Sequence, residues 1–193
     1  MLIVVRHGRT DANRAGLLLG RADPDLDDLG RRQAQAVADA VGPVDAVVSS
    51  PLRRTRQTAA AFDVRVEVDE RWVELDYGEW DGTPAAEVPE ATWARWRSDP
   101  HFAPPGGESL SELGVRVRSA CADMAEAARD QTIVVVTHVS PIKAALAWAL
   151  GVGDEISWRT FVTPASIMRV AVGPGGPSLH GFNDQAHLRD MPD

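Results

Sequence analysis

A chain of 193 residues is long enough for an α/β domain with a substantial apolar core. Its formal net charge of −8 argues against a nucleic acid or an anionic membrane as a partner, and its single cysteine excludes an intrachain disulfide and a cysteine-based zinc site. No window approaches about 18 consecutive apolar residues, and nothing resembles a signal peptide, so we expect a cytoplasmic protein.

The first predicted element is a buried strand over residues 1–5, because MLIVV is a short apolar run rich in β-branched residues. The strand leads directly into Arg6, His7 and Gly8. In open α/β sheets, ligands bind beyond the carboxyl ends of the strands, and a glycine there allows a sharp turn or a close approach to a ligand. By itself the Arg-His-Gly tripeptide is only a weak sign of an active site.

The next part of the chain alternates strands and helices. A loop is expected first, and Asp27 is suited to cap the helix that follows it. Pro51 fits the first turn of a second helix. The β-α-β order predicts parallel strands with right-handed crossovers. The expected segments are a loop at 11–28, helices at about 28–41 and 52–62, and strands at 45–49 and 64–68.

An acidic segment follows at residues 74–82, where ELDYGEWDG holds four carboxylates in nine residues. Acidic loops are most often simply solvated. We therefore assign structural roles to Asp76, Glu79 and Asp81.

Residues 83–107 differ from their surroundings, because five prolines interrupt them. Trp93 and Trp96 are three residues apart and so share one face of a short helix. Two interpretations stay open, and both can hold. The tryptophans form a satellite hydrophobic cluster under a long insertion, or the insertion is a lid that walls the leaving-group side of a pocket and sets specificity.

The C-terminal part predicts a long helix, a strand and a second helix. Ser109 and Glu112 form a capping box before an apolar stripe that includes Cys121, which we interpret as a core residue. A strand at 133–137 leads into His138, and a helix runs from Pro141 to about Leu150, where Gly151 stops it. Free backbone N–H groups at such a helix start favour an anion.

Two further expectations concern this part of the chain. Lys143, in the first turn of that helix, either reaches a second anionic group on a substrate or is an ordinary solvated lysine. Residues 166–172 predict an edge strand, which could pair with a second copy in a homodimer.

Three predicted strands thus end in polar clusters. Arg6 and His7 follow the first, the segment from Ser50 to Ala59 with its three arginines follows the second, and His138 follows the strand at 133–137. If these strands are neighbours in a parallel sheet, two imidazoles and several guanidinium groups meet in one crevice. Such a pocket suits a tetrahedral dianion, because guanidinium groups bind phosphate oxygens in a bidentate manner.

Four landmarks in this order carry a resemblance to a known family. They are Arg6-His7-Gly8, the segment from Ser50 to Ala59, Glu74-x-x-x-Gly78-x-Trp80-Asp81-Gly82, and Thr137-His138. The chain resembles the histidine phosphatase superfamily of phosphoglycerate mutases and small acid phosphatases, most closely its α-ribazole-phosphatase-type branch. The resemblance implies a three-layer α/β/α sandwich with a mostly parallel sheet, and a single domain over residues 1–193 with an insertion at 83–107.

The resemblance also implies the roles of individual residues. His7 would form a phosphohistidine, Glu74 would be the general acid and then the base, and His138 would complete the catalytic set. No metal or cofactor is implied, and the partner would be a small phosphorylated metabolite. Arg9 departs from the Glu or Gln usual after Arg-His-Gly. The implied phosphate-binding residues are Arg6, Thr10, Asn13, Arg54 and Val139.

Three other functions remain open at this point. A mutase of this family is generally longer, with segments that enclose the substrate, and this chain shows no counterpart. An inactive phosphate-binding module would have lost His7 or Glu74, and both are present. A zinc site on His7 and His138 is disfavoured, because flanking arginines oppose a cation and zinc usually takes three or four ligands. Hydrolysis of small phosphomonoesters is the function that we expect.

Overall fold

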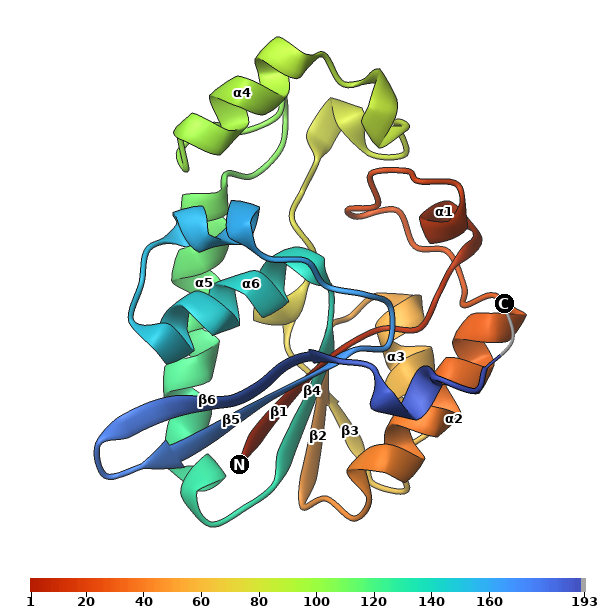
Figure 1. Cartoon of the computed structure of the whole chain (residues 1–193), viewed down its shortest axis with the longest axis vertical. Helices are drawn as coiled ribbons and strands as arrows, with labels where there is room; N and C mark the ends of the chain where they lie inside the picture. Colours follow the sequence, from red (N-terminus) through yellow and green to blue (C-terminus); the bar gives the residue numbers. More distant parts are fainter. Residues whose placement is uncertain (192–193) are drawn as a thin grey trace.

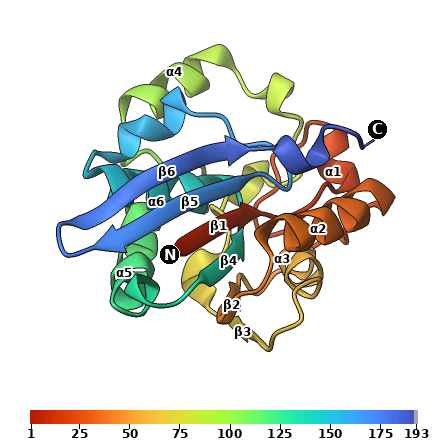
Figure 2. The same cartoon turned by 60° about the horizontal axis from the view of Figure 1, so that its bottom comes forward.

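The computed structural model describes residues 1–191 and contains six strands in one sheet. Their order across the sheet is β3-β2-β4-β1-β5-β6, with the first four parallel and the last two antiparallel (Figure 1, Figure 2). The predicted mostly parallel sheet is confirmed. The strands are β1 (Leu2–Arg6), β2 (Ala46–Ser49), β3 (Val66–Val68), β4 (Ile133–Thr137), β5 (Ile167–Gly173) and β6 (Gly176–Asp184).

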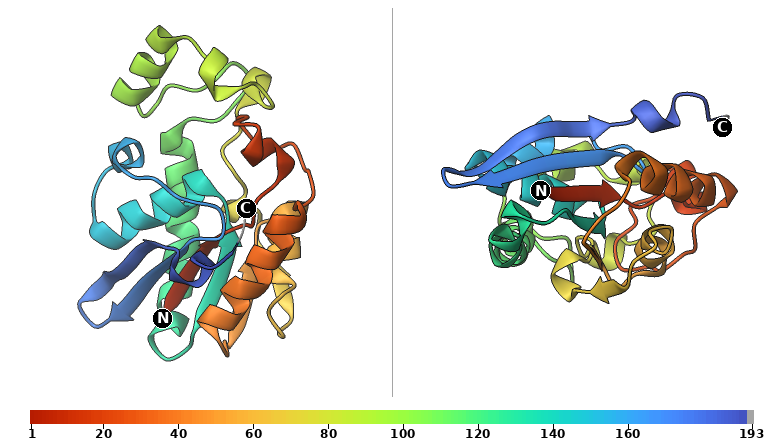
Figure 3. Two further views of the ribbon diagram at one scale, coloured as in Figure 1. Left: turned by 45° about the vertical axis from the view of Figure 1, so that its right-hand side comes forward. Right: turned by 90° about the horizontal axis from the view of Figure 1, so that it is seen from below.

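Helices cover both faces of this sheet. The pair α2 and α3 packs on one face and the pair α5 and α6 on the other, which is plain in the left view of Figure 3. The predicted three-layer sandwich is therefore confirmed. The α-helices are α1 (Asp11–Arg14), α2 (Asp28–Val41), α3 (Arg53–Ala59), α4 (Glu90–Ser98), α5 (Leu110–Ala125) and α6 (Val139–Leu150).

Alternation along the central strands builds the two cores. In β1, Leu2 and Val4 belong to the cluster under α5 and α6, whereas Ile3 and Val5 belong to the cluster under α2 and α3. Successive side chains of a strand point to opposite faces, so a strand buried on both sides must be apolar throughout. All five residues of β1 are buried for this reason.

Most predicted helix ends agree with the structure. The Asp27 side chain accepts a hydrogen bond from the Gly30 N–H at the start of α2, and the Ser109–Glu112 capping box opens α5. Two details differ. The expected loop at 11–28 contains the single-turn helix α1, and α6 begins at Val139, two residues before Pro141. Proline is tolerated throughout the first turn, so it marks a helix start only to within a few residues.

The prediction of an edge strand at residues 166–172 is wrong. This segment is β5, which lies between β1 and β6, and β6 is the edge (Figure 2). The sequence after Gly173 is rich in glycine and proline and gave no strand signal. The pairing of residues 166–172 with a second copy is excluded, because β1 and β6 already use both edges of β5.

The insertion at 83–107 lies beyond the carboxyl ends of the parallel strands, where α4 and its connecting loops form the top of Figure 1. Within the insertion, α4 contacts η5 (Asp154–Arg159), a 3₁₀ segment that follows α6. Within residues 1–191, no helix has the length and apolar character needed to cross a bilayer. The cytoplasmic location stays a prediction.

Candidate active site

The polar clusters after β1, β2 and β4 meet because these three strands are neighbours. Arg6 pairs in register with Thr137, and Ser49 pairs with Val136, so the residues that follow all leave the same edge of the sheet. The imidazole rings of His7 and His138 approach edge to face, with centroids 5.1 Å apart. The sequence prediction that the two histidines lie close together is confirmed.

Arg54 joins the two histidines. Its Nε lies 3.3 Å from His7 Nε2 and 3.2 Å from His138 Nδ1, so one N–H is shared between two imidazole nitrogens. The guanidinium is fully buried on the inner face of α3, whereas Arg53 and Arg56 on the same helix are exposed, as the helical spacing predicts.

Hydrogen bonds fix which nitrogen of each histidine carries the proton. His7 Nδ1 lies 2.7 Å from the carbonyl oxygen of Gly8 and must donate to it, so Nε2 keeps its lone pair. His138 Nε2 lies 2.7 Å from the Ser50 hydroxyl, which leaves Nδ1 as the acceptor that faces Arg54. The two unprotonated nitrogens, His7 Nε2 and His138 Nδ1, therefore both face Arg54 Nε.

Both imidazoles are neutral. Burial lowers the pKa of His7 and of His138 well below the usual histidine value, and the nearby Arg54 guanidinium lowers each further. A neutral imidazole with an unprotonated Nε2 is the nucleophilic form. His7 is thus held in the form that attacks an electrophile.

Arg6 adds a second buried cation beside the histidines. One of its terminal nitrogens donates to the Val162 carbonyl oxygen at 2.7 Å, but its Nε has no hydrogen-bond partner. Burial lowers the pKa of Arg6 to about 10, which still leaves it charged at neutral pH. A buried guanidinium N–H without a partner is costly unless an anion binds there.

Thr10 and Asn13 form the capping box of α1. The Thr10 hydroxyl donates to Asn13 Oδ1 at 3.0 Å and accepts from the Asn13 N–H at 3.2 Å. The side-chain nitrogen of Asn13, Nδ2, has no hydrogen-bond partner among residues 1–191. The structure thus makes Thr10 the residue that orients Asn13 and leaves the Asn13 amide as the free donor.

A loop between α1 and α2 holds Arg54 in place. Its terminal nitrogens donate to the carbonyl oxygens of Gly20 and Ala22 at 2.9 and 2.7 Å. The Asp81 carboxylate accepts the N–H groups of the same two residues at 2.8 and 2.7 Å. Asp81 therefore has the structural role that the sequence analysis assigned to it, and the role consists of supporting Arg54.

Glu74 lies at the start of α6. Its Oε2 accepts the Val139 N–H at 3.0 Å, and its Oε1 accepts the N–H groups of Leu75 and Ser140 at 2.7 and 3.2 Å. The sequence analysis named Val139 as a phosphate-binding residue, and in the structure its backbone N–H donates to Glu74. The predicted anion at this helix start is thus a buried side chain of the protein itself.

Two side chains to which the sequence analysis assigned no role hold the Glu74 segment. Arg116 donates to the carbonyl oxygens of Arg71, Val73 and Glu74, and its guanidinium is also paired with Glu108 at 2.7 Å. The hydroxyl of Thr137, at the end of β4, donates to the carbonyl oxygen of Trp72 at 2.5 Å. Together they fix Glu74 beside the histidine-bearing end of the sheet.

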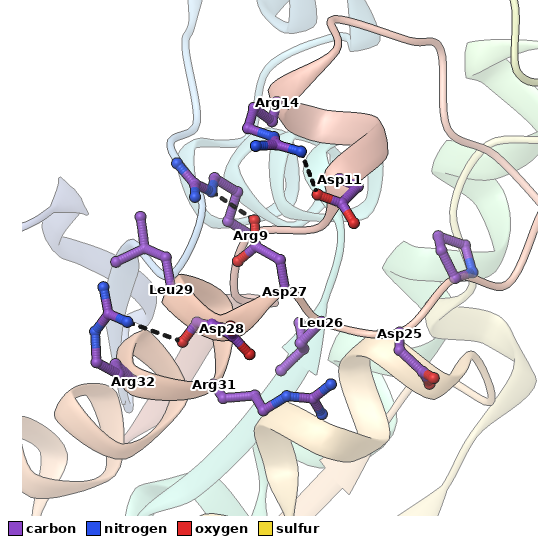
Figure 4. A pocket seen from close by; sticks show the side chains of 11 residues that line it. Arg9, Asp11, Arg14, Asp25, Leu26, Asp27, Asp28, Leu29, Arg31 and Arg32 are labelled. Carbon is purple, nitrogen blue, oxygen red and sulfur yellow. Dashed lines mark hydrogen bonds and ion pairs between the residues drawn. The ribbon is translucent and has the colours of Figure 1, made fainter. Parts of the chain in front are cut away.

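Arg9 is turned away from the histidines. Its Nε forms an ion pair with Asp27 at 2.7 Å, at the wall of a separate surface pocket of about 560 Å³ (Figure 4). Aspartates and arginines line this pocket in equal number, and Arg14 is paired there with Asp11. The pocket has no excess charge to select an anion.

Comparison with known proteins agrees with this geometry. The family model of the histidine phosphatase superfamily (branch 1) matches residues 2–185. The chain belongs to the histidine phosphatase superfamily. Phosphoserine phosphatase 1 of Hydrogenobacter thermophilus is 35% identical over 167 residues, which cover 81% of this chain and 79% of that protein.

Solved structures of the superfamily have the same fold. Phosphoserine phosphatase of Entamoeba histolytica, solved with phosphoserine, has a TM-score of 0.90 at 27% identity and covers 97% of this chain and 98% of its own. A putative α-ribazole-5′-P phosphatase of Escherichia coli has a TM-score of 0.82 at 26% identity and covers 95% of each chain. The chain spans about half the length, 54%, of mycobacterial relatives to which it is 37% identical.

In this superfamily member, the predicted tryptophans lie in a larger aromatic cluster. Trp93 and Trp96 stack with centroids 5.4 Å apart and an interplanar angle of 10°, and Trp158 of η5 meets both edge to face. Trp96 is fully buried and joins the core under α5 and α6, so the cluster is continuous with that core. Its connection to Trp158 had no local signal in the sequence.

Lys143 is half-buried, with its Nζ 2.7 Å from the carbonyl oxygen of Ser157 in η5. It is therefore not an ordinary solvated lysine. The sequence analysis assigned no role to Ser50, although it begins the second landmark segment, or to Arg116, which is one of two arginines on α5 and carries no local signal.

Proposed function

We propose that the protein hydrolyses small phosphomonoesters through a phosphohistidine on His7, without a metal ion. The observation that carries the proposal is the shared contact of Arg54 with His7 Nε2 and His138 Nδ1. It directs two imidazole lone pairs and two buried guanidinium groups into one space, and this combination suits a transferring phosphoryl group.

In the first step, His7 Nε2 attacks the phosphorus in line with the ester oxygen. The N–P bond forms as the P–O bond to the alcohol breaks. Arg6, whose Nε lacks a partner, and Arg54 stabilise the negative charge on the phosphoryl oxygens. Glu74, in its protonated form, gives its proton to the leaving alcohol.

In the second step, the Glu74 carboxylate takes a proton from a water molecule as the water oxygen attacks the phosphohistidine. The N–P bond breaks, phosphate leaves, and both His7 and Glu74 return to their starting forms. Arginine supplies the positive charge that a metal would otherwise provide. Within residues 1–191, no group of three or more His, Cys, Asp or Glu side chains is placed to hold a metal ion.

We also propose that residues 83–107 act as the lid of a single domain. The insertion contributes Trp93 and Trp96 to the aromatic cluster and packs against η5 on the Glu74 side of the histidines. Since Glu74 protonates the leaving alcohol, the alcohol lies on this side. The relatives of known activity support a small phosphorylated substrate, because the Entamoeba enzyme was solved with phosphoserine and also with 3-phosphoglyceric acid.

The deciding experiment is phosphate release from a panel of phosphomonoesters in EDTA, for the wild type and for His7→Ala. We expect metal-independent release by the wild type and a loss of at least about 1000-fold in the variant, since the nucleophile is absent. Acid-labile ³²P bound to the wild type and absent from His7→Ala would identify the intermediate.

Two results would overturn the proposal. Phosphate transfer between 2- and 3-phosphoglycerate without net hydrolysis would identify a mutase. Binding of phosphate esters with no turnover of any kind would identify an inactive binding module.

A further inference from the structure

A tight turn between η5 and β5 is bonded to the end of β1, where Arg6 and His7 lie. The Arg6 N–H donates to the Ser166 carbonyl oxygen at 3.1 Å, and the Arg6 guanidinium donates to the Val162 carbonyl oxygen at 2.7 Å. The Ala165 N–H donates to the His7 carbonyl oxygen at 3.1 Å. This segment therefore fixes the backbone of Arg6 and one end of its guanidinium, whose Nε has no partner within residues 1–191.

The conformation of the turn is unfavourable for its own sequence. The Ser166 N–H donates to the Thr163 carbonyl oxygen at 3.1 Å and closes a turn with Pro164 second and Ala165 third. Ala165 is fully buried and has a φ of 59°. A type II turn needs a positive φ at its third residue, where glycine or asparagine is usual because a Cβ atom disfavours this conformation. Another residue keeps it only where the surrounding contacts impose it.

Contacts of this kind come from the end of β6 and from the 3₁₀ segment η6 (Ala186–Leu188) that follows it. The Asn183 Oδ1 accepts the Thr163 N–H at 2.8 Å. His187 Nε2 lies 3.0 Å from the Ala165 carbonyl oxygen and must donate to it. The turn is thus bonded to the end of β1 and to the end of β6, the two neighbours of β5 in the sheet (Figure 2).

A bulge in β6 determines the position of Asn183. Asp184 pairs with Ile167 of β5. The next pair is Gly181 with Arg169, so two residues of β6 lie opposite the single residue of β5 between these pairs. Asn183 is one of the two and has a φ of 52°. Bulges re-aim a side chain and are frequent beside active sites, and here the bulged residue is the one whose side chain bonds the turn.

Strained backbone is concentrated at this one contact. Asn183 and Ala165 are the two non-glycine residues with a positive φ within residues 1–191. The Asn183 side chain bonds Thr163, and the carbonyl group of the preceding residue, Val162, holds the Arg6 guanidinium. Strain of this kind persists only where it is imposed, and it clusters at active sites.

We propose that Asn183 is a positioning residue of the active site, which holds the turn and through it sets the place of the Arg6 guanidinium. The inference rests on the proposed phosphatase function, in which Arg6 stabilises negative charge on the phosphoryl oxygens, and it adds a residue to that function. Stabilisation of a transition state depends on where the donor stands, so displacement of Arg6 lowers kcat more than it changes KM.

The test separates the side chain of Asn183 from its backbone conformation. Asn183→Gly keeps the positive φ but removes the acceptor, whereas Asn183→Asp keeps both. With p-nitrophenyl phosphate, we expect kcat to fall about 10- to 30-fold in Asn183→Gly, with KM changed less than about 2-fold, and Asn183→Asp to stay within about 3-fold of the wild type. Ser178→Ala is the matched control, because it removes another side-chain hydrogen bond of β6, to His180, and should leave both constants unchanged.

A double variant tests whether Asn183 acts through Arg6. In the Arg6→Ala background, Asn183→Gly should cause no further loss of kcat, because a positioning residue has no effect once the group that it positions is absent. The same fold-loss in both backgrounds would show a merely structural role and overturn the inference. An unchanged kcat in Asn183→Gly would overturn it as well.

A spectroscopic measurement tests the inference without turnover. The Nε–H group of Arg6 gives its own ¹H–¹⁵N signal, which is assigned as the one missing from Arg6→Lys. This signal should shift in Asn183→Gly and stay in place in Ser178→Ala. An unmoved signal in Asn183→Gly would overturn the positioning role, whereas failure of the wild type to hydrolyse any ester would contradict the proposed function and leave the signal to decide the position of Arg6.

Discussion

Ser50 is the residue that sets the protonation pattern of the site. Its hydroxyl lies 2.7 Å from His138 Nε2, and both groups are buried. Without this partner, the proton of His138 is free to move to Nδ1, where it would oppose the N–H of Arg54. A neutral imidazole has only one N–H, so the choice of partner at one nitrogen decides what the other can accept.

Ser50→Ala should therefore lower kcat about 3- to 10-fold, the value of one buried hydrogen bond, with little change in KM. The tautomer of His138, read from the ¹⁵N chemical shifts of its ring, should become mixed. Ser49→Ala is the control, since that neighbouring buried hydroxyl bonds only the Ser50 carbonyl oxygen. A single unchanged tautomer in Ser50→Ala would contradict this role.

The element that most depends on distant contacts is α4. It is a nine-residue helix whose start has no side-chain cap, and of its residues only Trp96 is buried. Trp96 contacts Trp93, Trp80, Phe102 and Trp158, so aromatic packing holds the insertion over the site. An isolated helix of this length is marginal in water, and its stability must come from this packing.

Trp96→Ala should lower the free energy of unfolding by about 3–5 kcal/mol, the usual range for a buried tryptophan. Hydrogen exchange should show the loss first in residues 90–98, while β1 and β4 keep their protection. Trp96→Phe should recover about half of the loss, because a smaller ring refills part of the space. Uniform loss of protection across the sheet in Trp96→Ala would show that α4 is not a separate cooperative unit.

The stability of the whole molecule should depend on pH through the two buried imidazoles of His7 and His138. Both have pKa values well below 6.5 in the folded state, because of burial and the Arg54 charge. In the unfolded chain they titrate near 6.5 and bind protons that the folded state does not bind. Their contribution to stability is therefore complete above about pH 6.5 and is lost as the pH falls below it.

We expect the free energy of unfolding to fall by about 1.4 kcal/mol per pH unit for each imidazole between about pH 6 and pH 5, in phosphate-free buffer. His7 and His138 together make the free energy of unfolding depend on pH, and His7→Gln should remove about half of that dependence. Denaturant unfolding at several pH values measures both slopes. An identical slope in the wild type and in His7→Gln would show that His7 is not held neutral by the fold.

The sequence by itself determined the parallel part of the sheet and the end of the sheet at which the candidate active site lies. Buried parallel strands must be apolar along their whole length, so β1 and β4 stand out, and the polar residues after them must lie at one edge. The capping residues of α2 and α5 could also be predicted from the sequence, because a cap is a local interaction between residues three apart.

Only the tertiary structure decided the contacts between segments far apart in the chain. The Val139 N–H donates to Glu74. Arg116 donates to the Glu74 carbonyl oxygen, more than forty residues earlier in the chain. Trp158 packs against Trp93 in the aromatic cluster. The place of β5 inside the sheet was hidden because β6, its outer neighbour, is rich in the glycine and proline that normally argue against a strand. Such contacts leave no periodic pattern in the sequence, since each depends on where the chain has already been placed by the rest of the fold.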